Sequence, residues 1–272
     1  MEYNLRAHSP DTITPVHRFT GDDLIDSRIY ELCMSGGYMS TLSFIIGGAK
    51  ALDLDVDSET LERWKRICNA AYLIDDFIDN ADDTRRACDL YDTSMGQIFA
   101  ATNSEILSTE TTPFETSPLL LPAIVLMKNS ITPLPADNVS NLQNSALGIS
   151  AVARRKIECL DVSSYLNLLR EEAYYTSQLI TESASSDMQT QPAYSDFKIW
   201  CQQLMHMAIL GDSAIDLRDD ANHDVTNVTP TMRNIAKIAI RAVAAGCTII
   251  QKKPQRRATV SSLVERSKFY RT

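Results

Sequence analysis

Glycine and proline are scarce in this chain of 272 residues, which contains nine glycines and ten prolines. An all-β domain of the same length would need many tight turns, and tight turns depend on these two residues. The six cysteines are scattered along the sequence without a Cys-x-x-Cys pair, as is usual for reduced, buried thiols in a cytoplasmic protein. The sequence therefore argues against an all-β fold and a disulfide framework, and it predicts a cytoplasmic location.

Basic charge and long apolar runs are also lacking. Lysine and arginine together number 26 against 35 aspartates and glutamates, which gives a net charge of −9, whereas a nucleic-acid-binding protein needs a basic surface. The longest apolar stretch, residues 235–250, contains Lys237 and Arg241 and falls short of the roughly 20 residues that a membrane-spanning helix needs. Residues 1–4 do not begin a secretory signal. We expect no nucleic-acid partner and no transmembrane segment.

Helical periodicity is what the sequence does contain. Apolar side chains recur at steps of three and four residues along most of the chain, which is typical of helices that bury one face. The pattern predicts an all-α fold of one domain over residues 1–272, with residues 1–20 as a flexible N-terminal segment. We expect helices over residues 22–30, 38–48, 58–79, 84–100, 118–131, 137–156, 163–183, 195–220 and 230–251, and a last one that ends near residue 270.

Capping residues suggest where several of these helices begin. Asp57 or Ser58 is expected to cap the helix over residues 58–79, and Ser163 and Ser195 are expected to cap two later ones. Thr229 followed by proline predicts a further helix start, because proline is favoured at the first helical position. Residues 102–117 are rich in serine and threonine and are predicted to form a loop.

A first acidic cluster lies at the end of the helix expected over residues 58–79. Asp75, Asp76 and Asp79 stand three and four residues apart, so their carboxylates share one side of the helix. Like charges at this spacing repel one another, and acids at a helix C-terminus oppose the helix dipole. Apolar residues lie between the aspartates, so the acids cannot all point away from the core. The competing interpretation is that Asp82 and Asp83 cap the next helix and that the other acids are solvated.

A second acidic cluster follows on the helix expected over residues 195–220. Asp212, Asp216 and either Asp219 or Asp220 form one stripe at steps of three or four residues. Two rows of carboxylates on separate helices suit a hard cation with oxygen ligands, and Mg²⁺ fits because it completes its octahedron with water and substrate phosphates. For His223, an exposed loop position is favoured over a role as a metal ligand.

The two clusters resemble motifs of a known family. Residues 75–79, Asp-Asp-Phe-Ile-Asp, match the DDxxD motif of the class I isoprenoid synthases, which have an all-α fold. The second cluster resembles the DxxxD-type motif of squalene and phytoene synthases. With Asp224, its spacing is most similar to that of small bacterial class IB terpene synthases and the moenomycin-pathway prenyltransferase. The register stays open, because Asp212 and Asp216 are four residues apart and so are Asp216 and Asp220.

This resemblance implies the ionisation of a prenyl diphosphate of 10 to 20 carbons with Mg²⁺, expected as three ions. It implies six metal ligands: Asp75, Asp76, Asp79, Asp212, Asp216 and Asp220. Basic side chains would hold the departing diphosphate, and six residues are candidates for this binding: Arg85, Arg86, Arg170, Arg218, and at the C-terminus Arg266 and Tyr270. Each of these arginines could equally occupy an ordinary surface position. The implied fold is also compatible with a homodimer.

Two missing motifs narrow the expected reaction. The Asn-Asp-x-x-Ser-x-x-x-Glu motif of many terpene cyclases is absent, and so is the Gly-Gly-Lys-x-x-Arg-Pro motif that helps prenyltransferases bind isopentenyl diphosphate. We expect a class I terpene synthase that cyclises or rearranges the prenyl cation, with a prenyltransferase that joins this cation to a second acceptor as the alternative. The sequence is also compatible with a helical metal-dependent hydrolase of nucleotides or ADP-ribose, with an inactive regulatory subunit and with a purely structural bundle.

Overall fold

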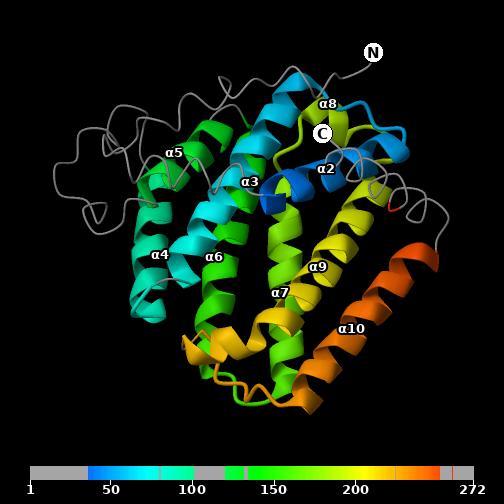
Figure 1. Cartoon of the computed structure of the whole chain (residues 1–272). Coiled ribbons are helices and arrows are strands. Elements are labelled where there is room, and N and C mark those ends of the chain that lie inside the picture. The colour runs from blue at the N-terminus through cyan, green and yellow to red at the C-terminus, as the bar shows by residue number, and fades with distance from the viewer. Residues whose placement is uncertain are drawn as a thin grey trace.

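The computed structural model describes residues 36–79, 81–100, 120–131, 134–223, 225–251 and 259. Every regular element in this part of the chain is an α-helix (Figure 1), which confirms the all-α prediction. The helices are α2 (Gly36–Ala51), α3 (Ser58–Asp79), α4 (Thr84–Ala100), α5 (Leu120–Ile131), α6 (Ala136–Glu158), α7 (Val162–Thr181), α8 (Ser186–Gln189), α9 (Tyr194–Asn222) and α10 (Met232–Gln251).

The expected helices within these ranges are present and differ by a few residues at their ends. The helices expected at residues 22–30 and near residue 270, and the loop at 102–117, lie outside the described residues. The short helix α8 was not predicted, because four residues are too few to show a periodic pattern. Asp57 caps α3 as expected, and its Oδ1 accepts a hydrogen bond of 2.7 Å from the backbone of Thr60.

Three helix starts differ from the prediction by one or two residues. Helix α7 is capped by Asp161 rather than Ser163, because the Asp161 carboxylate accepts the backbone N–H bonds of two following serines. Helix α9 begins at Tyr194 without a side-chain cap, so Ser195 already lies inside it. Helix α10 begins at Met232, because the N–H of Thr231 donates to the carbonyl of Thr229 in a tight turn and thereby delays the helix.

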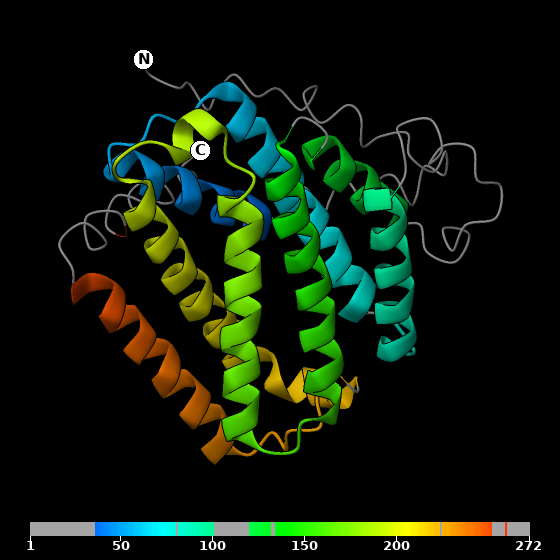
Figure 2. The same cartoon turned by 180° about the vertical axis from the view of Figure 1, so that it is seen from behind.

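The long helices form a bundle in which α6 and α7 lie side by side (Figure 2). Helix α9 packs against α7, and α10 covers the outer side of α9, while α4 and α5 pack on the side of α3 and α6. Helix α2 crosses the bundle and contacts both α3 and α9. Both α3 and α9 run downward in Figure 1, so their C-terminal ends, which carry the two acidic clusters, lie at the same end of the molecule.

Two groups of buried apolar side chains hold the bundle together. The first contains Trp64, Phe197 and Trp200, whose rings follow one another with centroids 5.7 and 5.9 Å apart. The second group lies between α6, α7, α9 and α10 and includes Tyr165 and Leu217. Burial of this much apolar surface is the main stabilising contribution in a helical bundle.

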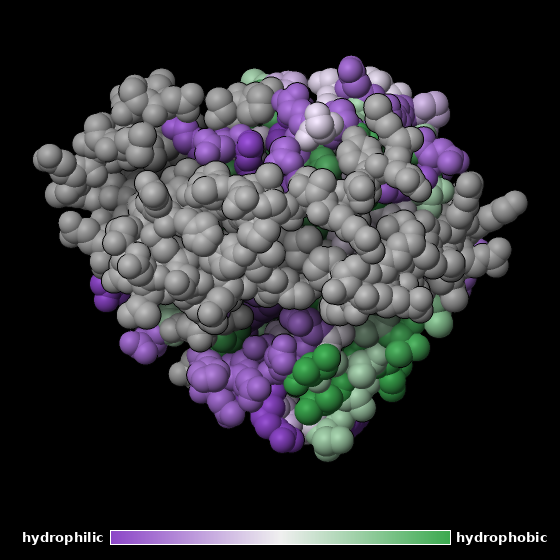
Figure 3. Space-filling view, turned by 45° about the horizontal axis from the view of Figure 1, so that its top comes forward, coloured by the Kyte–Doolittle hydropathy of each residue, from purple (hydrophilic) through white to green (hydrophobic). Residues whose placement is uncertain are grey.

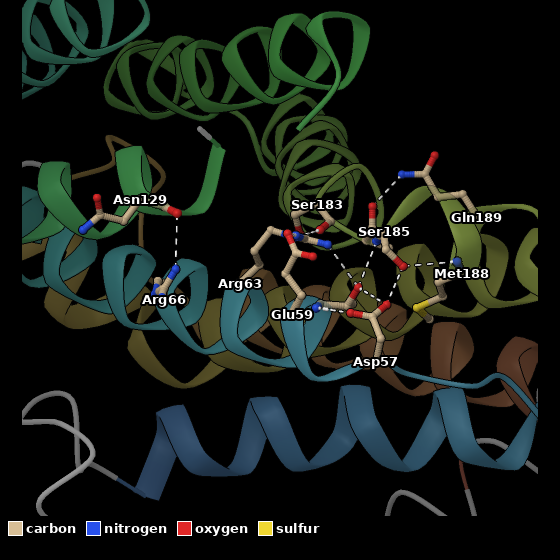
Figure 4. A network of polar contacts seen from close by, with 11 residues as sticks. Asp57, Glu59, Arg63, Arg66, Asn129, Ser183, Ser185, Met188 and Gln189 are labelled. Carbon is tan, nitrogen blue, oxygen red and sulfur yellow. Dashed lines mark hydrogen bonds and ion pairs between the residues drawn. The ribbon is translucent and has the colours of Figure 1, made fainter. Parts of the chain in front are cut away.

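A polar network fixes the N-terminal end of α3 to the segment between α7 and α8 (Figure 4). Arg63 is 2% exposed, and its Nε donates a hydrogen bond of 2.7 Å to the carbonyl of Ser183. Asp57 accepts a hydrogen bond of 2.5 Å from the hydroxyl of Ser185. The hydroxyl of Ser185 also accepts from the N–H of Met188, so one serine joins the starts of two helices.

The outer face of α10 exposes apolar side chains. Met232, Ile240 and Val243 are 75%, 68% and 68% exposed, and Figure 3 shows apolar residues gathered on the flank where α10 lies. Even so, none of the helices in the described residues combines the length and the apolarity that a membrane span requires.

Candidate functional site

The first acidic cluster occupies the last turns of α3, as the sequence predicts. Asp75 is exposed and Asp76 is half-buried, and both directly follow the buried Leu73 and Ile74. Asp79 ends the helix, but its side chain is not among those that the structure describes. The cluster therefore emerges from a buried segment of α3.

Helix α4, which follows the first acidic cluster, is capped by an aspartate outside the DDxxD motif. Asp83 accepts a hydrogen bond of 3.0 Å from the backbone N–H of Arg86 and so caps α4. Because Asp75 and Asp76 precede the end of α3, they cannot cap α4. The cap at Asp83 and the exposed Asp75 agree with the competing interpretation, whereas the half-buried Asp76 is not fully solvated.

The second acidic cluster lies on α9, with one stripe of carboxylates beside buried residues. Asp212 is exposed and Asp216 and Asp220 are half-buried, while Ser213 and Leu217 between them are buried. Although Asp212 is exposed, neighbouring protein atoms remove part of the hydration of its carboxyl group and raise its pKa, and the charge of Asp216 raises it further. Neighbouring carboxylates of the stripe therefore repel one another at Asp212, and the charge of Lys156 offsets this repulsion in part.

The residues that follow this stripe agree with the sequence analysis where they are described. His223 is exposed directly after α9, which is the position that the sequence favoured over metal binding. Asp224, which contributes to the resemblance with class IB enzymes, lies outside the described residues. Asp219 is exposed, whereas Asp220 is half-buried, so Asp220 is the better continuation of the stripe.

Tyr72 is a residue on which charges of both clusters act. Its ring is half-buried on α3, and its hydroxyl lies 3.2 Å from the Oγ1 of Thr41 on α2. Burial raises the pKa of Tyr72, and the charges of Asp75 on the same helix and of Asp212 on α9 both raise it further. This electrostatic interaction links the end of α3 with the stripe on α9.

Sequence reasoning missed a charged group that adjoins the second cluster. The Nζ of Lys156 on α6 lies 2.7 Å from the Oε2 of Glu172 on α7, and these side chains are only 13% and 21% exposed. Burial acts to lower the pKa of Lys156, but the charges around it, among them Glu172 and Asp220, outweigh this effect and raise it. In the sequence, Lys156 follows two arginines at a helix end, where basic residues are common, so no signal marked it.

The arginines proposed from the sequence lie in various surroundings. Arg85 forms an exposed ion pair of 3.0 Å with Glu158. Arg86, Arg170 and Arg218 are exposed. Burial lowers the pKa of His206 on α9, and the positive charge of Arg170 lowers it further.

The remaining two candidates, Arg266 and Tyr270, lie outside the described residues. Arg154, a further arginine on α6, forms ion pairs with Asp89 and Asp92, which fits a structural role. Within the described residues, the structure thus supports no single arginine as the diphosphate ligand.

The oxygen donors present suit Mg²⁺ held jointly with a phosphorylated ligand. In the described part of the chain, no three His, Cys, Asp or Glu side chains are grouped closely enough to hold a metal ion by themselves. Mg²⁺ does not require such a cage, because it commonly binds one or two carboxylates and takes its other ligands from water and phosphates. Carboxylates on two helices whose C-terminal ends lie at the same end of the molecule are compatible with this mode of binding.

Comparisons with known proteins give one structural similarity. The sequence matches no protein-family model and no curated protein sequence. The chain is similar to the solved structure of a cucumene synthase variant, with 13% sequence identity and a TM-score of 0.45, over 87% of this chain and 95% of that one. Similarity at this level does not assign the chain to a family.

Proposed function

We propose that this protein is a Mg²⁺-dependent class I terpene synthase of the cytoplasm, which ionises an allylic prenyl diphosphate of 10 to 20 carbons and cyclises or rearranges the resulting cation. The observation that supports this most directly is the raised pKa of Tyr72 on α3, to which the charges of Asp75 on the same helix and of Asp212 on α9 both contribute. Facing carboxylates of this kind suit divalent cations with a diphosphate between them.

In this proposal, the aspartates of each cluster hold the metal ions from one side. Asp75, Asp76 and Asp79 would act from α3, and the stripe from Asp212 to Asp220 would act from α9. Bound Mg²⁺ would neutralise the charge that develops on the departing diphosphate. The protein contributes by fixing the separation of the two helices, which α2 contacts together.

Tyr72 would contribute an aromatic face that does not react with the cation. A tyrosine is already neutral at pH 7, and the raised pKa of Tyr72 keeps its phenol further from ionisation, which matters because a neutral phenol is a far weaker nucleophile than a phenolate. Aromatic rings attract cations through their negative faces. A half-buried, neutral tyrosine beside both clusters therefore suits a site that must guide a carbocation without trapping it.

Product analysis tests the proposal. The purified full chain would be incubated with Mg²⁺ and geranyl, farnesyl or geranylgeranyl diphosphate, each with and without isopentenyl diphosphate, and the extracts analysed by gas chromatography–mass spectrometry. A hydrocarbon or alcohol formed from one allylic diphosphate alone is the expected result. A longer product that requires isopentenyl diphosphate would replace the proposal with a prenyltransferase, and no diphosphate release from any substrate would contradict both.

Three substitutions make the test specific to the two clusters. Asp76→Asn and Asp212→Asn should each lower kcat/KM by about 100-fold or more, because each removes a carboxylate that holds a metal ion. Asp196→Asn is the matched control, since Asp196 lies in the first turn of the same helix as Asp212, well away from the second cluster. Its activity should stay within about two-fold of the unchanged protein.

A further inference from the structure

The Lys156–Glu172 ion pair lies largely buried between α6 and α7. It joins the two helices with a distance of 2.7 Å, and α7 in turn packs against α9. The hydroxyl of Thr226, in the segment after α9, donates a hydrogen bond of 3.3 Å to the carbonyl of Lys156, and the N–H of Thr226 donates one of 3.4 Å to the carbonyl of Asp220. The backbone of Lys156 is thereby joined through Thr226 to the last aspartate of the stripe on α9.

Both members of the pair act on the second acidic cluster. Helix α7, which carries Glu172, packs against α9, and the charge of Lys156 interacts with that of Asp220 at the end of the stripe. Tyr165 lies within the same group, where it interacts with Lys156 and forms a hydrogen bond with Ser213. The pair therefore adds one positive and one negative charge beside the same stripe of carboxylates.

We propose that the Lys156–Glu172 pair sets the affinity of the second acidic cluster for divalent cations. Lys156 repels an incoming cation and Glu172 attracts it, so the two charges oppose each other at one site. This inference rests on the proposed function, in which the cluster on α9 binds metal ions. A moderate affinity has a purpose there, because ions that arrive with a diphosphate substrate must also leave with the diphosphate product.

Binding of Mn²⁺ to the full chain tests the inference without any measurement of activity. The free ion has an electron paramagnetic resonance signal that is lost on binding, so a titration gives the Kd. Lys156→Met removes the repelling charge and should lower the Kd by about ten-fold, and Glu172→Gln should raise it by about ten-fold. The double variant should return to within about three-fold of the unchanged protein. A merely structural pair would instead weaken binding in both single variants.

The neighbouring ion pair supplies a matched control. Arg155 and Glu171 join the same two helices at 2.6 Å, one residue earlier on each, but their side chains are 54% and 41% exposed. Water and salt screen exposed charges, so Arg155→Met and Glu171→Gln should change the Kd by less than about two-fold. Equal effects from both pairs would overturn the inference.

Further variants keep the test valid if a buried substitution disturbs folding. Lys156→Arg retains the charge and should leave the Kd close to its original value. Glu172→Gln keeps the size of the side chain and tests by itself whether loss of the negative charge raises the Kd. If the unchanged protein binds Mn²⁺ neither alone nor with inorganic pyrophosphate, the proposed function itself fails. If it binds Mn²⁺ but both single variants leave the Kd unchanged or shift it in the same direction, the function stands and only the role of the pair is overturned.

Discussion

Tyr72 offers a direct probe of whether the two clusters meet. Burial, Asp75 and Asp212 raise its pKa, so Asp75→Asn and Asp212→Asn should each lower that pKa, although the two aspartates lie on different helices. The pKa can be followed by NMR of tyrosine labelled with ¹³C at the ring carbon that bears the hydroxyl. The Tyr72 signal is assigned through a Tyr72→Phe variant.

An aspartate on α9 that lies outside the clusters gives the control for this titration. Asp196→Asn removes one negative charge from the first turn of the same helix that carries Asp212, and it should leave the pKa of Tyr72 unchanged. If Asp212→Asn has as little effect as Asp196→Asn, the two clusters do not face a common region. The proposed metal site would then lose its main support.

Arg63 shows how much stability a single buried charge contributes. Its guanidinium is bonded to the carbonyl of Ser183 at 2.7 Å and to the carboxylate of Glu59 at 2.5 Å. Arg63→Met leaves these partners without a donor, and the free energy of unfolding should fall by about 3 kcal/mol. Urea denaturation followed by circular dichroism measures the change.

A charged pair near the surface of the same helix is the comparison for Arg63. Lys65 and Glu62 form an ion pair of 2.6 Å in which the Glu62 side chain is 51% exposed. Lys65→Met should change the free energy of unfolding by at most about 0.5 kcal/mol, since solvent screens such pairs. Similar losses from Lys65→Met and Arg63→Met would show that the network around Arg63 stabilises the fold no more than a more exposed ion pair does.

At the level of elements, the start of α3 should make stability depend on acid. Burial acts to raise the pKa of Asp57, but hydrogen bonds from Ser185 and Thr60 outweigh it and hold the pKa below its usual value. A carboxyl group with a lower pKa in the folded state stabilises the fold above about pH 4, and this contribution is lost as the pH falls through the folded pKa. Acid should therefore loosen the junction of α3 and α8.

Substitution at this junction separates the acid effect from general destabilisation. Asp57→Asn should lower the free energy of unfolding by about 1 kcal/mol at pH 7 and should flatten its decline below pH 4. Ser185→Ala removes one of the hydrogen bonds to Asp57 and should flatten the same decline in part. Urea titrations at several pH values measure both slopes, and an unchanged slope in Asp57→Asn would contradict the assignment.

The contact between α2 and α9 depends on a glycine. A Cβ atom at Gly48 would lie 2.1 Å from the Cη2 of Trp200, and Trp200 is fully buried. Gly48→Ala should therefore push the helices apart, with a lower melting temperature and a loss of about 1–3 kcal/mol. Gly96→Ala in α4 is the matched control, because nothing lies within 4 Å of its Cβ position, and alanine should raise the melting temperature there. Equal effects would contradict the close packing.

Sequence patterns predicted the helices because periodicity and caps are local properties. The cap at Asp57 and the position of the first acidic cluster at the end of α3 could be read in this way. The start of α10 could not, since it depends on a tight turn at Thr229 that the Thr-Pro pattern does not reveal. Competition between neighbouring capping residues decides such boundaries.

At the scale of the whole molecule, the sequence could not show which elements meet. Resemblance to a metal-binding family suggested that aspartates of α3 and α9 act together, yet only the fold lets the charge of Asp212 on α9 act on Tyr72 of α3. The ion pair of Lys156 and Glu172 could not be predicted either, because it arises from the packing of α6 on α7 beside α9. Pairings of this kind are set by tertiary contacts.

If the two clusters form one site, a ligand must protect both helices together. With Mg²⁺ and inorganic pyrophosphate at about 100 times the Kd, binding adds about 2.7 kcal/mol to the folded state, so amide exchange that requires release of the ligand should slow by about 100-fold. Hydrogen exchange should slow in the last turns of α3 and around Asp212 in α9, but not in α5. Asp212→Asn should abolish the protection of α3 as well, because both clusters together hold the complex of metal ions and pyrophosphate. If α3 stays protected in this variant, the two clusters are separate cation sites.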